Sequence, residues 1–181
     1  MRSFLNTFKW FRKDESGNVT IEFVILFPLF FMVFLAIIET GILMLRQVML
    51  DRAVEISVRD LRLGNIEDIT HDELKDRICR DTLVLPSCEE SIRLELRPID
   101  ENTWVLPSQQ AICYDKEEEI NPPSDLNRGG DTELMVLRAC VKFSPFFPTT
   151  GLALGLPLDG NQHYGLLSTS TFVNEPQDDG V

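Results

Sequence analysis

A long uncharged apolar run near the N-terminus constrains this chain more than any other feature. Residues 23–38 carry no formal charge, and the apolar character continues past Glu39 to residue 45. As an α-helix, residues 23–45 would extend about 34 Å, which is enough to cross a bilayer core of about 30 Å. A cleavable secretory signal has an apolar region of only about 7 to 15 residues and ends in small residues. We therefore predict one transmembrane helix in about 21–45, with Glu39 near the outer interface and solvated or lightly paired.

The remainder of the chain is polar and acidic. The 181 residues include 17 Lys and Arg against 29 Asp and Glu, for a formal net charge of -12. A balance this acidic repels a phosphate backbone, which argues against nucleic acid as a partner. The length suits one modest domain with an appendage.

Four cysteines, Cys79, Cys88, Cys113 and Cys140, all follow the apolar run. An even number suits two disulfides in an oxidising compartment. The spacings contain no C-x-x-C pair, which argues against a zinc site. Three connectivities are open; the short first loop favours Cys79 with Cys88 and therefore Cys113 with Cys140, while reduced buried thiols are the alternative. Basic residues flank the apolar run almost equally, so the cysteines alone indicate a cytoplasmic N-terminus and an external body.

The segment GNVTIEF at 17–23 stands directly before the apolar run. A carboxylate such as Glu22 near hydrocarbon costs a few kcal/mol, although it could simply snorkel to the interface and favour the helix dipole. The segment resembles the processing site of type IV prepilins. This resemblance implies that a prepilin peptidase cuts between Gly17 and Asn18, and that Glu22 and Phe23 set assembly and register.

A narrower resemblance covers both ends of the chain. The segments FKWFRKDESG at 8–17, EFVILFP at 22–28, IIETG at 37–41 and STSTFVNEP at 168–176 look like a TadE-like protein of the tight-adherence, type IVb-like pilus system. The resemblance implies a minor pseudopilin of the bacterial inner membrane that can be incorporated into the extracellular pilus, with roles in cell adhesion and biofilm formation. Implied partners are the prepilin peptidase, other pilins and minor pseudopilins, the inner-membrane assembly platform and the lipid bilayer.

The predicted fold is α+β: a long N-terminal helix that continues as a spine against a small antiparallel sheet. Apolar residues at Leu50, Val54, Val58 and Leu61 form a helical stripe, Gly64 supplies a stop, and Pro28 is expected to kink the helix. A capping-box pattern at 70–73 predicts a second helix. Alternation of apolar and polar residues predicts a strand at 91–97, and we expect further strands at 104–106, 133–143 and 166–173. The expected divisions are a leader at 1–17, the long helix at 18–63 and a periplasmic α+β domain at 64–181.

Other chemistry in the sequence is sparse. Asp125, Asn127, Gly130 and Asp131 fit parts of a calcium-loop template, but its twelfth position is Val136 instead of a glutamate. Phosphate-loop, nucleophile-elbow and dinucleotide patterns are missing. We expect no cofactor and no catalytic residues. The alternatives to a pseudopilin are a permanently anchored periplasmic assembly or adhesion factor and, third, a membrane-tethered hydrolase.

Overall fold

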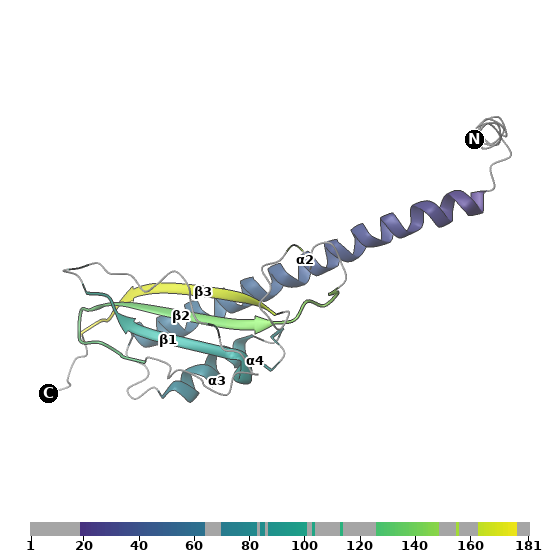
Figure 1. The fold of residues 1–181 in the computed structure, drawn as a ribbon. Helices are drawn as coiled ribbons and strands as arrows, with labels where there is room; N and C mark the ends of the chain where they lie inside the picture. Colours follow the sequence, from purple (N-terminus) through teal and green to yellow (C-terminus); the bar gives the residue numbers. More distant parts are fainter. Residues whose placement is uncertain are drawn as a thin grey trace.

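A single long helix dominates the computed structural model, which describes residues 19–63, 70–82, 84–85, 87–100, 103, 113, 126–148, 155 and 163–176. Helix α2, Val19–Arg62, has 44 residues and therefore extends about 66 Å. Its N-terminal half projects away from the rest of the molecule, and its C-terminal half lies against the sheet (Figure 1). The helix continues without a break through Pro28, so the kink stays a prediction.

The sheet has three antiparallel strands in the order β1-β2-β3: Ile92–Pro98, Leu134–Phe143 and Tyr164–Val173. The register pairs Leu96 with Leu137 and Ala139 with Ser168. Burial alternates along β1 and β3, as expected for strands with one face against a core. These elements confirm the strands predicted near 91–97, 133–143 and 166–173. The strand predicted at 104–106 lies outside the described residues.

Two further helices accompany the sheet. Helix α3, His71–Asp81, begins after Thr70, whose hydroxyl accepts a hydrogen bond from the Glu73 backbone N–H at 3.3 Å. This N-cap confirms the helix start predicted from the capping-box pattern. The short helix α4, Cys88–Ser91, follows Ser87, which has a φ of 52°.

The core lies between the sheet and the helices. On α2 the buried side chains include Leu50, Val54, Val58 and Leu61, which confirms that the predicted stripe faces the body. They pack in one cluster with apolar residues of all three strands and with α3, through Leu74 and Ile78. The predicted α+β fold, a long helix packed on a small antiparallel sheet, is therefore confirmed.

Two cysteine pairs lie at disulfide distance. Cys79 at the end of α3 is paired with Cys88 at the start of α4, with their Cα atoms 5.6 Å apart. Cys113 is paired with Cys140 of β2, with a Cα separation of 5.2 Å. This is the connectivity that the short first loop favours.

Candidate functional site

The N-terminal half of α2 is a bare apolar rod. Every residue from 19 to 34 is exposed, and the first fully buried residue of the helix is Glu39. The helix is long and apolar enough to cross a membrane, with a mean hydropathy of 2.8 over its most apolar stretch, none of which is buried. Residues 19–38 alone would extend about 30 Å, the thickness of a bilayer core. The structure thus provides a candidate membrane anchor that ends where the body begins.

Glu22 and Phe23 lie in the first turn of this rod, and both are exposed. Phe23 begins a series of rings on one face of the helix: its ring centroid lies 5.2 Å from that of Phe27, which lies 5.7 Å from that of Phe31. Four-residue spacing places Leu26 on the same face as Glu22. Glu22 is therefore a carboxylate on an otherwise apolar, uncovered surface. Gly17 and Asn18, the predicted cleavage residues, lie outside the described residues.

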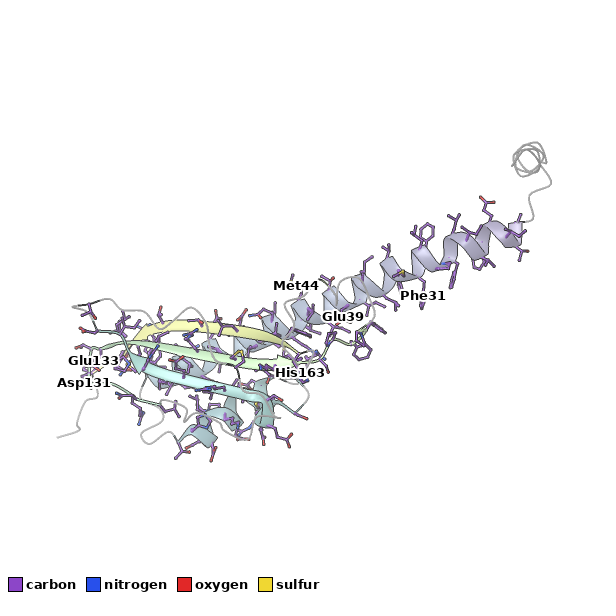
Figure 2. The ribbon with its side chains drawn as sticks, in the orientation of Figure 1. Phe31, Glu39, Met44, Asp131, Glu133 and His163 are labelled. Carbon is purple, nitrogen blue, oxygen red and sulfur yellow. A yellow bond between two sulfur atoms is a disulfide. The ribbon has the colours of Figure 1, made fainter. Side chains whose placement is uncertain are left out.

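Glu39 marks the point where the rod meets the body, as Figure 2 shows. Its side chain is only 1% exposed, and its two carboxylate oxygens accept hydrogen bonds from the backbone N–H groups of Phe146 and Phe147, each at 2.9 Å. The expectation of a solvated or lightly paired Glu39 is wrong. Two N–H donors offset the cost of removing the carboxylate from water, so the group can be buried.

The partners of Glu39 belong to the membrane-proximal turn, defined here as residues 144–148, which follows β2. Pro145 is buried in this turn, whereas Phe146 is exposed. The Phe146 and Phe147 rings meet edge to face with centroids 5.0 Å apart. One side chain of α2 therefore fixes both the backbone of the turn and its height along the helix.

A second buried polar contact lies two helical turns further along α2. Arg46 donates a hydrogen bond from Nη1 to the Tyr164 hydroxyl at 3.0 Å, and its guanidinium carbon lies 5.0 Å from the Phe143 ring centroid. Burial raises the pKa of Tyr164 above its usual value, and the nearby Arg46 opposes this rise. This contact attaches α2 to the ends of β2 and β3.

Glu39 and Arg46 belong to one seam of the helix. Residues 39, 43, 46, 50, 53 and 57 are spaced alternately by four and three, which places them on one face. Five of them are buried, and Leu43 is partly buried against the core. The two charged residues of the seam, Glu39 and Arg46, lie near the rod, and mostly apolar residues continue it along the sheet. It joins the rod and the body into one unit.

The end of the body far from the rod is held by the segment after β3. The Asn174 side-chain amide donates to the carbonyls of Arg128 and Gly130 at 2.7 and 3.1 Å. Glu175 forms an ion pair with Arg62 at the end of α2, at 3.0 Å. A cavity of about 260 Å³ lies between these elements. The Asn-Glu pair near the C-terminus thus fixes the loop before β2 and the end of the long helix.

Internal hydrogen bonds hold part of the loop that partly fits a calcium template. Asn127 accepts a hydrogen bond from the Gly129 N–H at 3.0 Å, and Glu133 accepts one from the Gly130 N–H at 2.7 Å. Asp125 lies outside the described residues. Within the part of the chain that the structure describes, no group of three or more His, Cys, Asp or Glu side chains could hold a metal ion.

Comparison with known proteins locates one familiar segment. Residues 17–59 match the family model described as TadE-like protein. The match confirms the predicted resemblance and covers the rod, Glu39 and Arg46. No curated protein and no solved structure matches the chain.

Proposed function

We propose that this chain, which is TadE-like over residues 17–59, is a minor pseudopilin that helps to initiate or assemble a tight-adherence pilus after its leader is removed. The match over residues 17–59 supports a component associated with the Tad pilus, because TadE-like proteins are generally structural and not enzymatic. The observation that best supports the finer role is the bare rod with Glu22 in its first turn, which one continuous helix joins to a folded body.

The rod suits two successive environments. Before assembly, residues 19–38 would lie in the bacterial inner membrane, with the N-terminus cytoplasmic and the body in the periplasm. After extraction, the same exposed apolar side chains would pack against helices of other pilins and minor pseudopilins. An uncovered apolar surface of this length needs lipid or protein around it, because its exposure to water is unfavourable.

Glu22 would set the register between subunits. Cleavage after Gly17 by the prepilin peptidase creates a positive α-amino group on Asn18, one helical turn before Glu22. Two unit charges at about 4 Å attract by roughly 4 kcal/mol at an effective dielectric of 20, and desolvation makes the net gain smaller. A neighbour in the wrong register would leave both charges unpaired in an apolar surrounding. The pairing therefore acts mainly through specificity, with Phe23 packed beside it.

The seam would transmit force between the rod and the body. When the assembly platform draws the rod out of the membrane, the body must follow without separating from α2. Glu39 and Arg46 attach the helix to the turn after β2 and to Tyr164 of β3, directly at the end of the body from which the rod emerges. We propose that they keep the body aligned with the helix during extraction.

Processing is tested with a matched pair of chains in cells that have an active prepilin peptidase. The unchanged chain should give a shortened membrane form that begins at Asn18, whereas Gly17→Leu should remain full length. Of the proposed divisions at 1–17, 18–63 and 64–181, the first boundary depends on this cut. An intact Met1 on the unchanged chain would instead support a permanently anchored assembly or adhesion factor.

A further inference from the structure

We propose that the membrane-proximal turn is a second membrane contact, through which Phe146 enters the outer interface of the bilayer beside the rod. The inference rests on α2 spanning the membrane, as in the proposed function, and adds a site on the folded body. Its occupant is the lipid surface.

The turn lies at the height where the exposed part of the helix ends. The exposed rod ends at Glu39, about 30 Å from Val19, so Glu39 lies at the level where a spanning helix leaves the hydrocarbon. The two hydrogen bonds from Phe146 and Phe147 hold the turn at this same level. Any membrane that the rod spans would therefore have its outer surface at the turn.

The turn also presents an exposed aromatic ring. Phe146 is 61% exposed, although Glu39 fixes its backbone and the preceding residue, Pro145, is buried. Exposed Phe side chains, like Trp and Leu, bury at the boundary between headgroups and acyl chains when the backbone that carries them lies at the membrane surface. Since the backbone is already fixed, inserting the ring would require little further ordering.

The charges of the body suit this orientation. Residues 134–158 contain no acidic residue, although the chain has 29 acids. Asp131 and Glu133 lie at the end of the body away from the rod (Figure 2). Between Glu22 and Asp51, helix α2 carries one acidic residue, Glu39. It is buried, and its carboxylate is paired with backbone N–H groups. An anionic membrane surface would thus meet little repulsion at the turn.

A single spanning helix leaves the body free to tilt and to rotate about the rod. A second contact beside the rod would restrict both motions. It would present the same face of the body to neighbouring subunits before extraction. The turn would therefore act as an orienting contact for assembly.

Tryptophan fluorescence in vesicles tests this contact. Phe146→Trp and, as a control, Val173→Trp are each placed in a chain that carries Trp10→Phe and Trp104→Phe, because these are its two native tryptophans. Val173 is also exposed, but it lies at the end of β3 opposite Tyr164, which contacts Arg46 near the rod. Both chains are reconstituted in phosphatidylcholine vesicles with or without bromine on the acyl chains.

The proposal expects brominated lipid to reduce the emission of the Phe146→Trp chain by about twofold or more, with a blue-shifted spectrum, and to leave the Val173→Trp chain unchanged. Equal quenching of the two chains would overturn it. A blue shift without quenching would also overturn it, since protein and not lipid would then cover the turn. Washing the vesicles with alkaline carbonate distinguishes failure of the turn contact from failure of the membrane anchor. Retention of both chains in the vesicles supports a spanning α2, whereas their extraction refutes it.

Discussion

Replacing Glu39 tests how strongly one side chain attaches the membrane-proximal turn to the helix. Glu39→Ala removes both acceptors of the N–H groups of Phe146 and Phe147, now bonded at 2.9 Å each. A buried donor left without a partner costs about 1 to 3 kcal/mol, so two would cost about 2 to 6. Phe146 is exposed, so water can reach the freed turn, and we expect about 3 kcal/mol.

Amide hydrogen exchange measures this attachment directly. A loss of about 3 kcal/mol corresponds to roughly 100-fold faster exchange at Phe146 and Phe147, at 1.4 kcal/mol for each factor of ten. Glu39→Gln should have a smaller effect, because its carbonyl keeps one acceptor while its amide faces the other N–H. The amides of β2 should stay protected.

Glu55→Ala is the matched control. Glu55 lies on the exposed face of the same helix, away from the seam, so its removal should leave exchange in the turn unchanged. If Glu39→Ala also leaves the exchange of Phe146 and Phe147 unchanged, the carboxylate does not hold the turn. Glu39 would then play no part in joining the rod to the body.

Three further predictions concern other parts of the chain. Glu22→Ala should leave membrane insertion intact but lower the amount of chain in sheared pili severalfold compared with Glu55→Ala. The reason is that the Glu22 carboxylate, which would set the register between subunits, is lost. Equal amounts in the pili would show that Glu22 is only an interfacial group. Cys79→Ser should lower the free energy of unfolding in urea by about 2 to 4 kcal/mol, and alkylation without reductant should label none of the four native cysteines; free labelling of Cys88 in the folded, unchanged chain would contradict the pairing. Burial raises the pKa of Tyr164, so its contribution to stability is complete below the ordinary value of 10.0 and is lost as the pH rises from 10.0 through the higher folded-state pKa; over this interval stability should fall more steeply in the unchanged chain than in Tyr164→Phe, and parallel curves would contradict it.

Local patterns made most of the fold predictable. The long helix, the Thr70 cap and the three described strands each depend on neighbouring residues: a continuous apolar run, a side chain that reaches three residues ahead, or a short strand-forming segment, which alternates in β1 and is almost wholly buried in β2. The stripe of α2 that begins at Leu50 was predictable for the same reason. Helix α4 was not, because four residues carry too little periodicity and Ser87 before it adopts a left-handed backbone conformation.

The contacts between rod and body could not be predicted, because they join residues far apart in the sequence. Glu39 bonds to N–H groups more than a hundred residues away, and backbone donors leave no mark in the sequence. Arg46 and Tyr164 are equally distant, and neither belongs to a recognisable motif. One signal was present: a lone carboxylate in an apolar helix needs a partner, and this applied to Glu39 as much as to Glu22. Treating Glu39 as solvated overlooked that requirement.

The central claim is that this chain, which is TadE-like over residues 17–59, is cleaved and then becomes part of the fibre. The most direct measurement is N-terminal sequencing of the chain recovered from purified, sheared pili, with the membrane fraction of the same cells beside it. The account predicts a chain that begins at Asn18 and is present in the pili. A chain that begins at Met1, or one that stays wholly in the membrane fraction while pili form normally, would contradict it.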